Sequence, residues 1–402
     1  EAAVTLLVTP NSLRAVERIT LGGTPFEKLG DGSWRVEVEL QPGINRLIVE
    51  SFDSDDVAGL DTVRYLHLSV QSEVRGLIWK DPRGGHTATM LPNGNLILIG
   101  GSRSTSTPAL PEIFVLPAGG STVEDLAARL SFPRLGHTAT MLPDGRILVA
   151  GGTAVPRLSS VSDLQEVPEI YDPVAGTMTP LVVEGPPIRR TYHTAEVYNS
   201  GIGGPVITLL GGTGDIQYTP SSLIGIRQDI RTFQLEGDTL KALSPAVGPF
   251  VEPLTGHSQT PLASQPPGIA TRQLITGAIF LTGAIEAQSF ILDPRSDLGL
   301  EFLTLVAPIT RRTEHAAVLM APGRVLRVSG VTTIDMSPEP SADLYDDTLG
   351  RFLSFGDDTT FRPSPRHLQS ATNLGGGRIL VLGGFNQGGT APITAEYISF
   401  DL

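Results

Sequence analysis

The 402-residue chain contains no cysteine, so disulfides, zinc–thiolate sites and thiol nucleophiles are excluded. Aromatic residues make up only 6% of it, and just two of them are tryptophan. Sugar sites usually stack the ligand on exposed aromatic faces, so carbohydrate binding is disfavoured, and Trp34 and Trp79 are expected in the core. No apolar run is long enough to span a bilayer.

Charged residues are also few, at 18% of the chain, and the net charge is −13. An acidic chain is a poor general ligand for nucleic acids or for anionic membranes. Glycine and proline are abundant instead, with 45 and 32 copies. This composition favours a turn-rich, all-β protein over a helical one.

Residues 1–72 are expected to form a separate small β-sandwich. Short strand-like runs follow one another, with clear alternation in WRVEVEL (34–40). The stretch DGSWRVEVELQPGINRLIVESFD (31–53) resembles bacterial immunoglobulin-like modules. That resemblance implies an exported or cell-surface protein. Glu1 opens directly on an expected strand, which fits removal of a targeting segment.

One loop of this first region carries a dense group of carboxylates, Asp53, Asp55, Asp56 and Asp61. Carboxylates gathered on a loop are the ligands that calcium prefers. A solvated, highly charged turn explains the same residues, and it is favoured because no complete calcium-loop pattern is present.

The rest of the chain is organised by a repeat. Residues 133–152, PRLGHTATMLPDGRILVAGG, predict two strands around an Asp-Gly turn, ending in a glycine pair. The chain repeats this pattern with variations. The aligned positions are His86, His137, His193, His257, His315 and Gln369. A third strand follows each glycine pair, as in PEIYDP, and usually a fourth. In the fourth unit, either Gly283 ends the second strand or RQLITGA is that strand.

The recurring R-x-x-H-T-A-T-x-L-P-D-G-R-x-L-V-x-G-G pattern resembles the kelch repeat, in its galactose-oxidase-like bacterial form. The resemblance covers about 330 residues and implies a six-bladed β-propeller over residues 73–402. Because a ring needs its ends to pair, residues 75–80 are expected to form the outer strand of the blade built by residues 366–402.

Five units carry an arginine three residues before the aligned position: Arg83, Arg134, Arg190, Arg312 and Arg366. In kelch binding modules the equivalent loop position lines the mouth of the central channel. The resemblance thus implies a ring of guanidinium groups, suited to a carboxylate, a phosphate or an acidic peptide. The alternative is that each arginine braces its own blade, since repeated residues usually serve packing.

The repeated histidines are expected to make structural hydrogen bonds, because residues on separate blades do not converge on one metal ion. Galactose oxidase holds copper through a Tyr-His pair at this position, which Tyr192-His193 matches, but its cross-linked cysteine is absent here. The sequence therefore predicts a non-enzymatic, extracellular, periplasmic or cell-surface binding protein without a cofactor. Its expected partner is a protein, an acidic peptide or a small anion. The partner is expected at the loop face, the propeller face that carries the variable loops between the second and third strands of the units. An oxidase or a structural component of a surface assembly remains as the alternative.

Overall fold

The structure is a computed structural model, and it divides into two compact units, residues 1–71 with 398–402, and residues 72–397. The residues it describes are 2–8, 15–21, 23–40, 45–55, 62–66, 70–75, 77–199, 204–215, 224–227, 229–243, 254–264, 266, 269, 271–277, 289–296, 299–305, 310–332, 337–354 and 363–400. Among them no helix has the length and hydrophobicity needed to cross a membrane.

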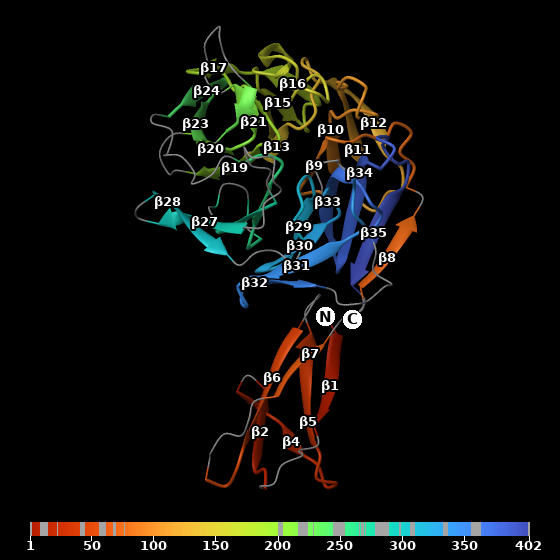
Figure 1. The fold of residues 1–402 in the computed structure, drawn as a ribbon, viewed down its shortest axis with the longest axis vertical. Helices are drawn as coiled ribbons and strands as arrows, with labels where there is room; N and C mark the ends of the chain where they lie inside the picture. The colour runs from red at the N-terminus through yellow and green to blue at the C-terminus, as the bar shows by residue number, and fades with distance from the viewer. Residues whose placement is uncertain are drawn as a thin grey trace. The chain divides into compact units, whose positions relative to one another are not determined.

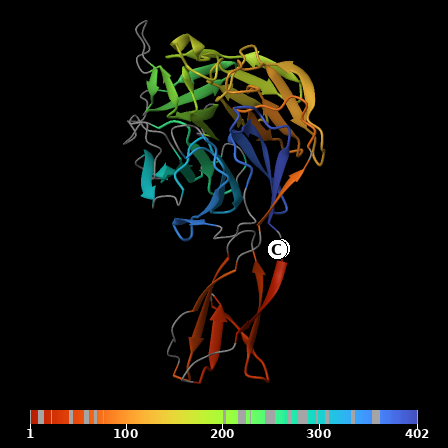
Figure 2. The same cartoon turned by 45° about the vertical axis from the view of Figure 1, so that its right-hand side comes forward.

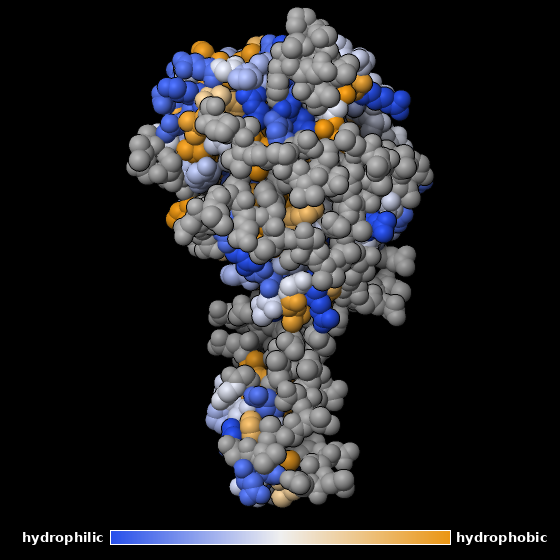
Figure 3. All heavy atoms as spheres, turned by 60° about the vertical axis from the view of Figure 1, so that its left-hand side comes forward, coloured by the Kyte–Doolittle hydropathy of each residue, from blue (hydrophilic) through white to orange (hydrophobic). Residues whose placement is uncertain are grey.

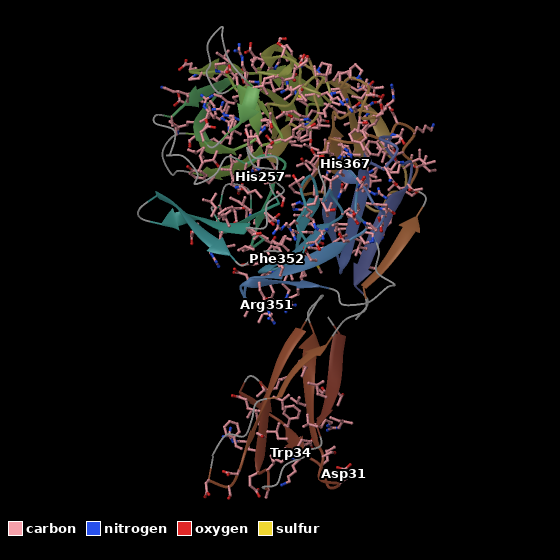
Figure 4. All side chains as sticks on the ribbon, viewed as in Figure 1. Asp31, Trp34, His257, Arg351, Phe352 and His367 are labelled. Carbon is pink, nitrogen blue, oxygen red and sulfur yellow. The ribbon has the colours of Figure 1, made fainter. Side chains whose placement is uncertain are left out.

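The first unit contains two antiparallel sheets. One has the order β1 (Ala2–Val8), β5 (Trp34–Leu40), β4 (Glu27–Lys28), and the other β3 (Thr24–Pro25), β2 (Arg18–Leu21), β6 (Asn45–Phe52), β7 (Thr62–Leu66). The hydrophobic core cluster of this unit contains Ile19, Phe26, Trp34, Val36 and Val49, with Trp34 labelled in Figure 4. The alternation in 34–40 therefore puts one face of β5 in the core, as expected. The immunoglobulin-like assignment stays a prediction.

The second unit is an all-β propeller of the kelch type with six blades (Figure 1). Five blades are four-stranded sheets, and blade three carries β17 (Val182–Glu184) as a fifth strand, parallel to its fourth. Blades one to three comprise β9 (Thr87–Met90), β10 (Leu96–Ile99), β11 (Glu112–Leu116) and β12 (Glu124–Arg129); β13 (Thr138–Met141), β14 (Ile147–Ala150), β15 (Glu169–Asp172) and β16 (Thr177–Pro180); and β19 (Thr194–Asn199), β20 (Pro205–Leu210), β23 (Ile230–Glu236) and β24 (Thr239–Ala242).

Blades four to six comprise β25 (Ser258–Pro261), β26 (Gln273–Thr276), β27 (Ser289–Ser296) and β28 (Gly299–Leu305); β29 (Ala316–Ala321), β30 (Arg324–Val328), β31 (Ala342–Asp346) and β32 (Arg351–Ser354); and β33 (His367–Gly375), β34 (Arg378–Phe385), β35 (Ala395–Phe400) and β8 (Val70–Arg75). Smaller elements are η1 (Val161–Asp163), β17 (Val182–Glu184), β18 (Arg190–Thr191), β21 (Thr213–Asp215) and β22 (Ile224–Ile226).

The first strands of successive blades contact one another around the ring, so they lie innermost. From there each sheet runs outward to its fourth strand, and in blade three to β17 beyond it. Figure 2 shows the blades from another side. The second strands are continuous apolar runs, LILI in β10 and ILVA in β14, and all their residues are buried. Such runs are typical of strands covered on both faces. Here neighbouring blades provide the cover, because Ile97 and Ile99 pack in one cluster with Ile147 and Val149.

The closure of the ring differs from the sequence expectation by about five residues. The outer strand of blade six is β8 (Val70–Arg75), not a strand at 75–80. The next segment runs beside blade one, where Ile78 and Thr122 form a parallel bridge. Leu77 and Trp79 are buried between blades one and six, in a cluster that includes Leu98 and Leu382. Trp79 is thus a core residue, but it fills the join between two blades.

The fourth unit follows the second of the two alternatives left by the sequence. RQLITGA contains the second strand, β26, and Gly277 ends it with φ 71°, the conformation of Gly100 and Gly151 in blades one and two. Gly283 lies outside the described residues.

Candidate functional site

The five repeated arginines lie inside the blades. Arg83, Arg134 and Arg312 have 0% of their surface exposed, and Arg190 and Arg366 have 1%. Arg134 shows the contacts they make: Nη1 donates to the carbonyl oxygen of Gly151 at 2.9 Å, and Nη2 donates to Glu169 at 2.7 Å. Burial lowers the pKa of Arg312 to about 10, still far above neutral pH, so a buried guanidinium stays charged.

The partner of each arginine is a carboxylate at the start of the third strand of the same blade. The pairs are Arg83–Glu112 at 2.9 Å, Arg134–Glu169 at 2.7 Å, Arg190–Asp229 at 3.2 Å, Arg312–Asp343 at 3.6 Å and Arg366–Glu396 at 3.6 Å. In blade four, Leu254 replaces the arginine and Ser289 replaces the acid. Both members disappear together because either charge alone would be buried without compensation.

These contacts correct the expectation that Arg83, Arg134, Arg190, Arg312 and Arg366 bind a ligand. The guanidinium groups are buried and already paired, so a molecule at the loop face does not reach them. The alternative reading describes them better: each one fixes the entry of its blade to the start of the third strand.

The repeated histidines connect neighbouring blades. Each imidazole Nε2 lies beside the hydroxyl that follows the aligned residue of the preceding blade. The pairs are Ser370–His86 at 3.1 Å, Thr87–His137 at 3.1 Å, Thr138–His193 at 3.3 Å, Thr194–His257 at 3.0 Å and Ser258–His315 at 2.8 Å. Burial lowers the pKa of His86 to about 4 and that of His257 to about 3, so these rings are neutral at pH 7. In His86 the other ring nitrogen, Nδ1, lies 3.0 Å from the carbonyl oxygen of Arg83 and donates to it, so Nε2 accepts from the Ser370 hydroxyl.

The join between blades five and six is built differently. Its hydroxyl position is Ala316, its imidazole position is Gln369, and the first glycine of the pair is Ser329. The Gln369 side chain donates to the carbonyl oxygen of Val328 at 2.8 Å instead. At the join between blades four and five, a Cβ on Gly277 would lie 2.4 Å from Cε1 of His315. The side chain of Ser329 is therefore accommodated only because the next blade has Gln369, and not an imidazole, at the facing position.

A closed circle of backbone hydrogen bonds surrounds the channel at the loop face. Its six members, one from each blade, are Gly85, Gly136, Tyr192, Gly256, Glu314 and Leu368, and each N–H donates to the carbonyl oxygen of the member in the preceding blade at 2.8–3.1 Å. All six have positive φ, between 51° and 68°. Glycine adopts this conformation freely, whereas Tyr192, Glu314 and Leu368 hold it at a cost of roughly 1–3 kcal/mol each.

Those three side chains line a cavity of about 480 Å³ at the channel mouth, which we call the cup. Its other walls include Arg157 and Phe385. Loops 102–111 and 385–393 meet beside it, where the Thr105 N–H donates to the carbonyl oxygen of Gly389 at 2.9 Å. Strained backbone concentrates at functional sites, so the cup is the candidate site at this face.

The most polar contact in the cup joins blades five and six. Nδ1 of His367 lies 2.7 Å from Oε2 of Glu314, and both side chains are largely buried. Figure 4 shows His367 and His257 toward the middle of the ring and Arg351 on the outer strand β32. Sequence reasoning identified Tyr192 only as part of a copper-type pair and missed Glu314, His367 and Leu368, because it looked for residues that repeat. The signal was the opposite one: Tyr192, Glu314 and Leu368 replace a glycine.

The acidic loop of the first unit is only partly described. Asp53 and Asp55 are in the described part, where Oδ1 of Asp53 accepts from the backbone N–H of Asp55 at 3.0 Å. Asp56 and Asp61 lie outside it. Among the described residues, no group of three or more histidine, aspartate or glutamate side chains is placed to hold a metal ion.

Fold and repeat together define a kelch-type β-propeller. No protein-family model matches the chain. Part of it is similar to an F-box/kelch-repeat protein of Arabidopsis thaliana, with 27% identity over 181 residues, 39% of this chain and 36% of that protein. The chain thus spans about a third of the length of this curated relative. The solved structure of YjhT superposes with a TM-score of 0.59 at 13% identity, over 81% of this chain and 96% of that one, a likeness of fold alone.

Proposed function

We propose that this protein is a non-enzymatic binding module that holds a segment of a partner protein in the cup. The observation that carries the proposal is the substitution of Tyr192, Glu314 and Leu368 at positions where the other three blades have glycine. A residue that costs backbone strain without serving the repeat is best explained by what its side chain contacts. The name of the plant relative, an F-box/kelch-repeat protein, fits an interaction role.

The chemistry of the cup suits a short polar peptide segment. Its volume of about 480 Å³ is that of a pocket for a small ligand or a few side chains. Glu314, His367 and Tyr192 offer hydrogen-bonding groups, and Arg157 supplies an exposed cation at the wall. The sequence predicts that the repeated arginines attract an anionic group, but these arginines are buried. Arg157 is exposed and supplies this positive charge instead. Resemblance of residues 31–53 to bacterial surface modules supports an extracellular, periplasmic or cell-surface location.

The test uses the chain's own repeat to design the variant. Replacing all three side chains by glycine (Y192G/E314G/L368G) gives the cup the backbone of blades one, two and four, so the fold should persist. We expect proteins retained by the wild type from the extracellular or envelope fraction of the source cells to be lost with this variant. V174S is the control, because Val174 is 97% exposed on a turn of blade two. Equal capture by wild type and triple variant, at equal melting temperature, would contradict the proposal.

A second candidate function is acid–base catalysis at the same place, favoured by the His367–Glu314 contact of 2.7 Å. A carboxylate that orients an imidazole in a cavity is an arrangement that proton-transfer enzymes use. H367Q and E314Q separate the two functions. Loss of a turnover activity with unchanged partner capture would favour the enzyme, and loss of capture alone would favour the binding module.

A further inference from the structure

A second cavity opens at the other end of the channel, away from the cup. Its volume is about 710 Å³, and it is lined by the six innermost strands and by the turns that follow them. Three of the five methionines of the chain, Met90, Met141 and Met320, contribute to its wall. Methionine is flexible and polarizable, and it adapts to apolar ligands of varied shape. We call this cavity the methionine channel.

One residue of the wall breaks the repeat. Three positions after the aligned histidine, five blades have threonine or valine: Thr89, Thr140, Thr260, Val318 and Thr372. Blade three has Glu196. Since four blades form their inner strand with threonine here, a carboxylate is not needed for the fold. Departure from the repeat is the same signal that marks the cup.

The Glu196 carboxylate has no hydrogen bond or ion pair to any residue that the structure describes. It is also the one ionisable side chain among the described residues of the channel wall. The strands packed against β19 face it with uncharged groups: Thr140 and Met141 from β13, Gln259 and Thr260 from β25, and Thr208 from β20. Tyr198, farther along β19, is a phenol whose pKa is raised by burial, so it too faces Glu196 uncharged at neutral pH. Burial alone raises the pKa of Glu196 to about 7.

We propose that the methionine channel binds an aliphatic primary ammonium ion, with the charged end on Glu196 and the alkyl chain against the methionines. A lone carboxylate in a largely uncharged cavity lacks the counter-charge that a buried ion requires. An ammonium group supplies that charge with three donors, and such a charge-assisted hydrogen bond is stronger than a neutral one. An alkyl chain of a few carbons fills the apolar part of the wall. This site is independent of the cup.

The experiment follows the methionine methyl groups by NMR in protein labelled at the methionine ε-carbon, with n-hexylammonium as the probe. We expect the Met90, Met141 and Met320 signals to shift saturably, whereas that of Met178, on the outer strand β16, stays in place. Hexanol and hexanoate are matched probes without the positive charge. Equal binding of hexanol would overturn the proposal, because it would make the channel merely apolar, and so would the absence of any shift with hexylammonium.

Two variants test the role of Glu196. E196T installs the residue of the other blades and E196Q keeps the shape, and each should weaken hexylammonium binding at least about tenfold. E236Q, at the exposed end of β23, is the charge-matched control. Wild-type affinity should rise between pH 5.5 and 8.5, because the carboxylate ionises while the amine stays protonated, and E196Q should lose that dependence. Unchanged affinity in folded E196T or E196Q would refute the proposal.

Discussion

Arg134 and Glu169 form an ion pair with a separation of 2.7 Å in which neither side chain is exposed to solvent. Three N–H groups of the guanidinium also meet backbone carbonyl oxygens, those of Phe132, Gly151 and Val167. The pair therefore stabilises one blade from within. It connects the segment before the first strand with the end of the second strand and the start of the third strand. Blade four does without it, and both partners are uncharged there.

We expect R134L to destabilise the propeller by about 3–5 kcal/mol, because it leaves Glu169 buried without a partner. The double variant R134L/E169S copies the Leu254 and Ser289 of blade four, and it should lose clearly less. Urea unfolding followed by the fluorescence of Trp79 in a W34F background measures both, since the chain has two tryptophans. A double variant that is no more stable than R134L would show that the missing charge partner is not the cause.

The join between blades five and six predicts a coupled set of substitutions. Q369H alone should destabilise the protein by about 1–3 kcal/mol, because the imidazole would meet the Cβ of Ser329 and find no hydroxyl at Ala316. A316T/S329G/Q369H restores the arrangement of the other joins and should recover the loss. The urea midpoints of the single and the triple variant decide between coupling and independent effects.

The hydrogen-bonded circle predicts how its glycines respond to a methyl group. Gly256 has φ 68°, and a Cβ there would lie 2.5 Å from Oγ1 of Thr313 in the next blade. G256A should therefore cost more than the roughly 1 kcal/mol that alanine pays for this backbone conformation alone. Gly350 is the matched control, with φ 61° and open space around its Cβ position. Equal losses of unfolding free energy for G256A and G350A would contradict close contact between the blades.

The buried histidines predict instability in acid. Burial lowers their pKa in the folded protein, to about 4 for His86, whereas the unfolded chain titrates near 6.5. The neutral rings stabilise the fold fully above pH 6.5, and this contribution is lost as the pH falls toward 4, by up to about 1.4 kcal/mol per pH unit for each histidine. Urea midpoints at pH 7.5, 6.0 and 5.0 measure the slope. H86Q should flatten it, and an unaltered slope would exclude His86 as a contributor.

The sequence predicted the propeller well because its signals are local and recur. The Asp-Gly turn, the glycine pair and the apolar second strand each follow from neighbouring residues: in PDG, for example, Oδ1 of Asp144 accepts from the Arg146 N–H at 3.0 Å, and Gly145 has φ 87°. The closing strand was misplaced because its pairing is not local. Nothing near Val70 in the sequence shows that it lies beside β35.

The candidate site was predicted less well, for a physical reason. Residues such as Arg134 and His137 recur because every blade must be braced and joined in the same way. A ligand meets only one place on the ring, so we expect its contacts from residues that differ between blades, and Glu314 and Glu196 are such residues in the linings of the two cavities. On the face in Figure 3, too, hydrophobic residues of the described part lie in small separate groups, so hydropathy alone marks no site there.

The amide at Gln369 has a consequence for how the propeller comes apart. Its bond to Val328 takes up no proton, whereas imidazoles make the corresponding bonds at the other five joins. Acidification would thus weaken the five joins that contain an imidazole and would spare the join between blades five and six. Blades five and six would stay together longest, as a two-sheet remnant from which the ring could reassemble when neutrality returns.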